Sequence, residues 1–149
     1  MLVIRNKVLS CIVNFFLMIW QFPQLLTGVI GLAIFRNYTI YTNELAKVRV
    51  LRVNKGNLFG TACFSSGVFI FVTDDCSEET LRHETGHSVQ SLMSGWLYHI
   101  IVSMPSICRF WYRRLKNKSH EWYLSGYPEK QAEKLGHTLR SHDISPKEL

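Results

Sequence analysis

Apolar residues gather in two long stretches of the chain, and the first runs from Val8 to Phe35 without a charged residue. A straight helix of that length would measure about 42 Å, more than the roughly 30 Å hydrocarbon core of a bilayer. Pro23 lies near the middle and removes a backbone donor, so we predict a kink or break between two helical arms, each too short to cross a bilayer alone. The stretch predicts a re-entrant or interfacial hairpin or one tilted transmembrane helix. A buried core hairpin is the alternative.

Alternating apolar and polar residues mark the next part of the chain. The segment from Lys47 to Val53 has the period of two that is typical of a half-buried strand. Two more strands are predicted, from Leu58 to Phe64 and from Val68 to Thr73, with a tight connection between them. We expect the last of these strands at an edge of the sheet, where it could pair with an extended peptide.

A helix is predicted to follow, ending near Ser94 with Gly95 as its stop. Ser77 or Asp75 can cap its start, and the glutamates after Ser77 suit the helix dipole. Its apolar face is predicted to comprise Leu81, Val89, Leu92 and Met93.

Positive charge gathers at the end of the second apolar stretch, which runs from Trp96 to Ile107. The chain has 17 Lys and Arg against 11 Asp and Glu, and the segment from Arg109 to Lys118 places several basic residues beside aromatic ones. This pattern is typical of an interfacial anchor on an anionic leaflet. It could also bind single-stranded nucleic acid, but the adjoining apolar stretch favours membrane lipids as the partner. A solvated basic helix end is the alternative.

Composition limits the size and class of the protein. With 149 residues, 47% of them hydrophobic and 19% charged, the chain is one domain with appendages and is not intrinsically disordered over most of its length. Its four cysteines form no C-x-x-C pair, so we expect free or buried thiols.

The segment His83-Glu84-Thr85-Gly86-His87 has the pattern H-E-x-x-H and falls within the predicted helix. Histidines four residues apart lie one above the other on a helix, so both imidazoles can bind one Zn²⁺. Glu84 is turned by about 100° from His83 and can contact a metal-bound water without ligating. Two exposed histidines on an ordinary helix are the alternative.

A catalytic zinc needs a third protein ligand, and Glu129 is the candidate, at the start of a short amphipathic helix that is predicted to reach Leu139. Glu133 lies one turn later on the same face and could accept the N–H of a ligating histidine. The rival third ligands are His99, His120 and His137. Spacing alone leaves this choice open.

These motifs carry a family resemblance. An H-E-x-x-H helix followed by a helix that begins E-x-x-A-D resembles the gluzincin metallopeptidases, notably the membrane-embedded CAAX-prenyl and heat-shock-linked type. More closely, the chain resembles a group of small, uncharacterised bacterial membrane proteins. The matching segments are Trp20 to Gly28, Phe71-Val72, Ser77 and Thr80, His83 to His87, Gln90-Ser91, Gly95 to Tyr98, Pro105-Ser106 and Glu129 to Gly136.

The resemblance covers most of the chain and implies that His83, His87 and Glu129 bind zinc and that Glu84 is the catalytic base. The chain departs from the group at two positions. Thr85 stands where the group has tyrosine and Glu133 where it has aspartate, and neither change removes an expected ligand. Because the group has no assigned reaction, the resemblance implies a peptidase-like site without a known substrate.

Together these features predict an α+β fold, with zincin-like metal-binding helices beside a small antiparallel sheet and a hydrophobic helical hairpin at the N-terminus. We expect the membrane hairpin over residues 1–37, the metal-binding domain over 38–140 with its apolar segment 96–118, and a polar tail over 141–149.

The expected function is that of a membrane-associated zinc metallopeptidase of the bacterial inner membrane, which acts on a peptide or protein substrate with Zn²⁺ as cofactor and Glu84 as general base. Candidate oxyanion donors are His120, Tyr123 and Tyr127. The alternative is a non-catalytic, membrane-anchored zinc protein whose metal holds a small fold together.

Overall fold

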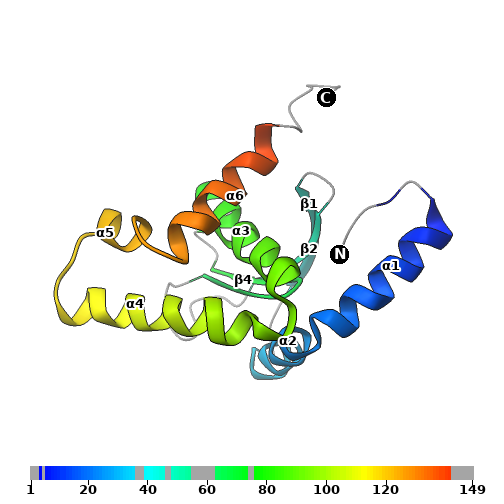
Figure 1. The fold of residues 1–149 in the computed structure, drawn as a ribbon, viewed down its shortest axis with the longest axis horizontal. Coiled ribbons are helices and arrows are strands. Elements are labelled where there is room, and N and C mark those ends of the chain that lie inside the picture. The colour runs from blue at the N-terminus through cyan, green and yellow to red at the C-terminus, as the bar shows by residue number, and fades with distance from the viewer. Residues whose placement is uncertain are drawn as a thin grey trace.

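The computed structural model describes residues 4, 6–35, 39–45, 48–54, 63–73 and 76–141, and of 39–45, 48–54 and 139–141 it describes the backbone alone. Figure 1 shows the arrangement of the elements. The helices are α1 (Lys7–Trp20), α2 (Phe22–Ile34), α3 (Glu78–Ser94), α4 (Met104–Leu115), α5 (His120–Leu124) and α6 (Glu129–Ser141), with a 3₁₀ turn at Gly95–Leu97 and a π-helical turn at His99–Ser103. The strands are β1 (Thr39–Leu45), β2 (Val48–Asn54), β3 (Phe64–Ser66) and β4 (Phe69–Val72).

The four strands form one small sheet in the order β1-β2-β4-β3. The outer pairs, β1 with β2 and β3 with β4, are antiparallel, whereas β2 and β4 run parallel. An α+β fold is therefore confirmed, but the sheet is mixed rather than wholly antiparallel. Residues 58–62 of one predicted strand and the polar tail after 141 lie outside the described residues.

Strand β4 lies inside the sheet, so the prediction of an edge strand from Val68 to Thr73 is wrong. Both of its faces are covered: Phe69 and Phe71 pack against α2, and Ile70 and Val72 pack against α3. A continuous apolar run is typical of such a two-sided strand. The edge position belongs to β3 instead.

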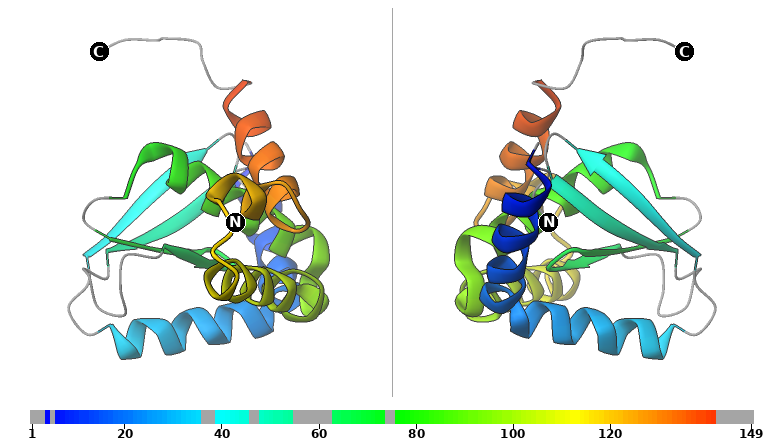
Figure 2. Two further views of the ribbon diagram at one scale, coloured as in Figure 1. Left: turned by 90° about the vertical axis from the view of Figure 1, so that its left-hand side faces the viewer. Right: turned by 90° about the vertical axis from the view of Figure 1, so that its right-hand side faces the viewer.

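Helices α2 and α3 cover opposite faces of the sheet, as Figure 2 shows. Leu25 and Leu32 of α2 join the phenylalanine cluster, so the predicted membrane segment contributes to the core. On the other face Leu81 and its neighbours Val89 and Leu92 pack on the sheet as predicted. Each fully buried side chain of this size contributes about 1.5–3 kcal/mol.

Met93 was predicted on the buried face of α3, but its side chain is 61% exposed. It follows Leu92 by one residue, which turns it by about 100° away from the sheet. The prediction is therefore wrong for Met93.

The N-terminal stretch breaks as expected. Helix α1 ends at Trp20, Gln21 forms the turn, and Pro23 occupies the first turn of α2, where its missing N–H has no intrahelical acceptor. The two helix axes meet at 83°, so the arms form a bend rather than an antiparallel pair. Among the described residues no single helix is long and apolar enough to span a bilayer, whereas this bent pair together has the length and composition.

Side chains at this bend are tied to the C-terminal end of α3. The hydrogen bonds run from Trp20 Nε1 to the Leu92 carbonyl (2.9 Å), from Ser91 Oγ to Gln21 Oε1 (2.9 Å) and from Gln24 Nε2 to the Gly95 carbonyl. The last carbonyls of a helix lack intrahelical donors, and here Trp20 supplies a donor to one of them, the Leu92 carbonyl. The bend and α3 therefore form one structural unit.

Candidate metal centre

Helix α3 carries both histidines of the H-E-x-x-H motif, and local sequence fixes its ends. Ser77 caps its start, since its Oγ accepts the Thr80 backbone N–H at 3.1 Å. Gly95 caps its end with a φ of 52°, a left-handed value that favours glycine. The predicted bounds are confirmed.

Helix α6 crosses α3 so closely that the backbones nearly touch. A Cβ on Gly86 would lie 2.0 Å from the Ala132 carbonyl oxygen, and one on Gly136 would lie 2.3 Å from the Arg82 carbonyl oxygen. Glycine at these two positions is what allows the approach. The crossing carries Glu129, the first residue of α6, to the histidines of α3.

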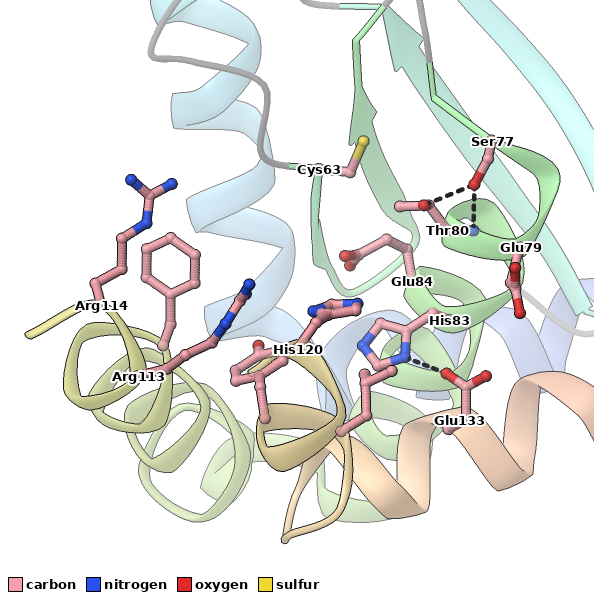
Figure 3. A pocket seen from close by; sticks show the side chains of 13 residues that line it. Cys63, Ser77, Glu79, Thr80, His83, Glu84, Arg113, Arg114, His120 and Glu133 are labelled. Carbon is pink, nitrogen blue, oxygen red and sulfur yellow. Dashed lines mark hydrogen bonds and ion pairs between the residues drawn. The ribbon is translucent and has the colours of Figure 1, made fainter. Parts of the chain in front are cut away.

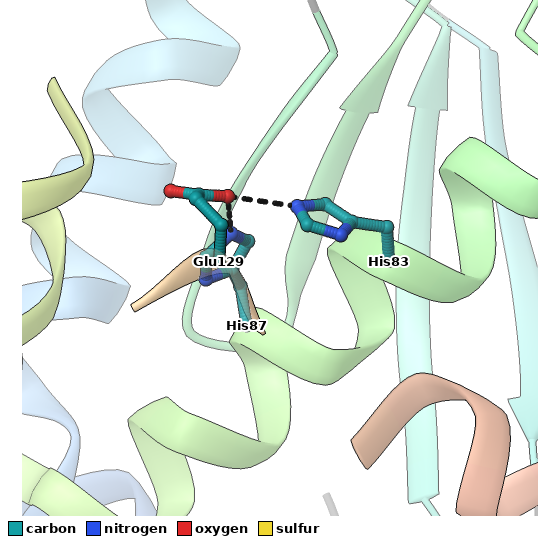
Figure 4. Close-up of side chains that lie close together, drawn as sticks. All are labelled: His83, His87 and Glu129. Atoms are coloured by element: carbon teal, nitrogen blue, oxygen red, sulfur yellow. Dashed lines mark hydrogen bonds and ion pairs between the residues drawn. The ribbon is translucent and has the colours of Figure 1, made fainter. Parts of the chain in front are cut away.

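Glu129 meets both histidines through a single carboxylate oxygen, as Figure 4 shows. Its Oε2 lies 2.9 Å from His83 Nε2 and 3.1 Å from His87 Nε2. The donor atoms of all three side chains lie within 4.8 Å of one another, and the Glu129 side chain is fully buried. These are the three side chains predicted as ligands, whereas His99, His120 and His137 are not in this group.

The outer nitrogens of both imidazole rings are also engaged. Glu133 Oε2 accepts the Nδ1–H of His83 at 2.8 Å, which is the role predicted for Glu133. Gln90 Oε1 lies 2.7 Å from His87 Nδ1, and Gln90 Nε2 donates to the Pro128 carbonyl (3.0 Å) and to the Gln131 side chain (2.9 Å). Because the amide N–H groups of Gln90 face these acceptors, its oxygen faces His87 and accepts the Nδ1–H.

With both Nδ1 atoms protonated, each neutral ring presents its Nε2 lone pair to the Glu129 carboxylate. Three lone-pair donors that face one another repel unless a positive charge lies between them, either a proton on one of the rings or a metal cation. Ligands about 2.0–2.1 Å from a tetrahedral Zn²⁺ lie about 3.4 Å apart, close to the observed 2.9 and 3.1 Å. In addition, Glu129 Oε1 is buried and has no hydrogen-bond partner among the described residues. The donor set therefore fits zinc.

The charges of these groups reflect the same convergence. Burial alone would lower the pKa of His83, but the carboxylates of Glu129, Glu84 and Glu133 outweigh it and raise that pKa to about 9. Burial would raise the pKa of Glu129, but hydrogen bonds from His83 and His87 hold it well below its usual range. The site thus favours an ionised Glu129 carboxylate with a positive charge beside it, on His83 or on a metal ion.

In the described part of the chain, two pockets open beside the cluster, and Glu84 and Tyr123 border both. The larger, of about 610 Å³, also reaches His83 and His120. The smaller, of about 470 Å³, runs past His87 to strand β3. Figure 3 shows the Glu84 carboxylate directed into the larger pocket. Glu84 is not in the group of converging donors, as expected for a residue that contacts water rather than metal.

The candidate oxyanion donors differ in their placement. The Tyr123 hydroxyl lies 3.3 Å from Ser106 Oγ, and burial, with the negative charge of Glu129, raises the pKa of Tyr123 far above its usual range. The hydroxyl therefore keeps its proton at neutral pH. The His120 ring stacks on Tyr123 at 6.1 Å. The Tyr127 hydroxyl, in contrast, donates to the Ile101 carbonyl at 2.7 Å.

No protein-family model, curated protein or solved structure matches the chain. The family resemblance of the motifs therefore stays an expectation. One participant of the site was not predicted: Gln90, the hydrogen-bond partner of His87. Its position three residues after His87, within one helical turn, is the signal that could have identified it.

Proposed function

We propose that the protein is a membrane-associated zinc metallopeptidase with Glu84 as its general base. The observation that carries this proposal is the contact of one Glu129 carboxylate oxygen with the Nε2 atoms of both motif histidines, at 2.9 and 3.1 Å. It joins two helices whose motifs are more than 40 residues apart, and it leaves pocket space beside the donors for a water and a substrate.

The residues around the donors suit peptide hydrolysis. Zn²⁺ bound to His83, His87 and Glu129 would lower the pKa of a coordinated water and polarise a carbonyl. Glu84 accepts a proton from the attacking water and passes it to the leaving amine. The protonated Tyr123 hydroxyl donates to the carbonyl oxygen as negative charge develops there. Ser65 and Ser66 of edge strand β3 border the smaller pocket, so β3 is the strand available to an extended peptide.

Membrane association is supported by the apolar side chains that α1, α2 and the segment 96–115 expose. Phe16 and Ile100 are each 63% exposed, and Trp111 is 58% exposed. In Figures 1 and 2, α2 and α4 lie along one side of the molecule, away from α6. An exposed apolar surface of this extent is typical of contact with a membrane. We propose that this side rests in the interface of the inner membrane.

The test of the catalytic proposal is Glu84→Gln, with Glu121→Gln on exposed α5 as the matched control. Glu84→Gln keeps size and polarity but cannot accept the water's proton. We expect its zinc content to equal that of the wild type, and its hydrolysis of casein or of membrane-protein fractions to fall roughly a hundredfold to ten-thousandfold. The control should keep full activity. Equal cleavage of a confirmed substrate by wild type and Glu84→Gln would refute the mechanism.

The same proteins test the structural alternative. X-ray absorption of the zinc-loaded wild type should detect three protein ligands and one water oxygen. Four protein ligands, together with no hydrolysis by either protein, would mean that the metal is structural.

A further inference from the structure

The larger pocket has opposite charges at its two ends. At one end are His83 and the carboxylates of Glu84 and Glu133, beside the proposed metal. At the other end are Arg113 and Arg114, from the last turn of α4. Figure 3 shows the Arg113 guanidinium directed inward beside His120, with Arg114 farther out.

Both guanidinium groups contact aromatic rings, and neither has an anionic partner among the described residues. The Arg113 guanidinium lies 5.9 Å from the centre of the Tyr123 ring, and its Nε donates to the Lys118 carbonyl at 3.3 Å. The Arg114 guanidinium lies 5.2 Å from the centre of the Phe110 ring. No salt bridge among the described residues includes either arginine. Their remaining N–H groups are therefore available at the pocket.

Arg109, one turn earlier, behaves differently. Its Nε donates to the Tyr123 carbonyl at 2.7 Å, a second nitrogen donates to the Trp122 carbonyl, and the group stacks 4.0 Å above the Trp122 ring. Arg109 thus joins α4 to α5, and this join positions the helix end that carries the two pocket arginines.

We propose that Arg113 and Arg114 bind a carboxylate of the substrate, so that the enzyme prefers peptides with a negative charge close to the scissile bond. The planar guanidinium matches a carboxylate with two parallel hydrogen bonds. The carboxylates at the metal end repel the same group, so the charge pattern also sets the direction in which a peptide lies. This inference rests on the proposed function, because it places the scissile carbonyl at the metal end.

The carboxylate can belong to an acidic side chain or to the C-terminus of a short peptide. Three quenched fluorescent peptides of one apolar sequence separate these sources: one with an internal Glu and an amidated end, one with Gln and a free C-terminal carboxylate, and one with Gln and an amidated end. The enzymes are the full-length wild type, the double variant Arg113→Gln/Arg114→Gln, and the control Lys116→Gln/Lys118→Gln, which removes the same charge from the same helix end.

We expect the wild type to cleave at least one carboxylate peptide with a kcat/KM roughly tenfold to a hundredfold above that of the uncharged peptide, as hydrogen bonds between charged groups give. The arginine variant should lose this preference and the lysine control should keep it. Ionic strength of about 1 M, where the Debye length is about 3 Å, should weaken it. Equal kcat/KM for all three peptides would overturn the inference and leave the proposed function intact.

A binding assay separates the two proposals if no peptide is cleaved. Fluorescence anisotropy with zinc-loaded Glu84→Gln measures the affinity for each labelled peptide without turnover. Tighter binding of a carboxylate peptide, abolished when Arg113 and Arg114 are also replaced, would support the carboxylate site while the peptidase proposal fails. Equal binding of all peptides would overturn the inference. It would also be overturned if the arginine variant lost binding only to phosphatidylglycerol vesicles, since the arginines would then serve lipid.

Discussion

Replacing Gly86 with alanine tests whether the backbone contact between α3 and α6 sets the metal site. The added Cβ would lie 2.0 Å from the Ala132 carbonyl oxygen and 2.7 Å from its carbonyl carbon. Both atoms belong to the backbone, so no side-chain rotation relieves the contact. Helix α6 has to move by about 1.4 Å to reach the 3.4 Å of an ordinary contact, and Glu129 moves with it.

That displacement is large for a zinc ligand, whose distances hold to about ±0.2 Å. Loss of a hydrogen bond to the non-ligating nitrogen of a zinc-bound histidine lowers metal affinity roughly tenfold to a hundredfold. We expect zinc affinity to fall by at least that factor. Glycine-to-alanine changes inside exposed helices stabilise by about 1 kcal/mol, but here the forced contact costs about 1–3 kcal/mol. The free energy of unfolding of the metal-free protein should therefore not rise, and should fall where the contact outweighs the helix preference.

Zinc affinity is measured by competition with a chromophoric chelator, and stability by urea unfolding in detergent. Met93→Ala, at an exposed position of the same helix, is the control and should bind zinc as the wild type does. Adding Ala132→Gly to Gly86→Ala should rescue nothing, because the clashing carbonyl stays. Wild-type zinc affinity and a more stable Gly86→Ala protein would refute the role of the crossing, and rescue by Ala132→Gly would refute a backbone contact as its cause.

Three further predictions concern the outer hydrogen bonds, pH and the membrane. Glu133→Ala should lower zinc affinity roughly tenfold to a hundredfold, measured against Lys134→Ala, and unchanged affinity would exclude a role for Glu133 in orienting His83. With a chelator present, the free energy of unfolding should fall as pH rises from 6.5 through about 9. The reason is that burial is outweighed by nearby carboxylates, which favour protonated His83 in the folded state and raise its pKa. His83→Gln should flatten that part of the profile of melting temperature against pH, and an equal slope in both proteins would contradict the prediction. The wild type should stay with membranes after carbonate and high-salt washes, and recovery as a soluble monomer without detergent would exclude the proposed membrane contact.

Local patterns predicted the metal helix but not the choice of third ligand. Its ends follow from a capping Ser77 and a left-handed Gly95, which act within a turn of the chain. Glu129 was one of several candidates, because spacing does not tell which distant helix crosses α3. The decisive residues are the small ones at the crossing, Gly86 and Gly136. Matched small residues on two helices are a signal that could have favoured Glu129 over the histidine rivals.

The prediction that the strand from Val68 to Thr73 lies at the edge of the sheet failed for a related reason. The uninterrupted apolar run from Val68 to Val72 predicts a strand, and such a run also indicates that both of its faces are buried. Helices α2 and α3 supply the two layers that cover it. The short segment Phe64–Ser66 forms the edge strand beside β4, and its three residues border the pocket next to His87.

Gln21 and Gln24 bear on whether the N-terminal arms are a detachable anchor. Both interrupt an otherwise apolar stretch, and an amide that faced lipid without a partner would cost several kcal/mol. They are 2% and 0% exposed, and their partners lie at the end of α3, about 70 residues away. Contacts at that separation leave no periodic pattern, so the sequence predicted the break but not its attachment. Since the bend holds the C-terminal end of the helix that carries His83 and His87, an arm that rests in the membrane would fix the orientation of the metal site to the bilayer surface.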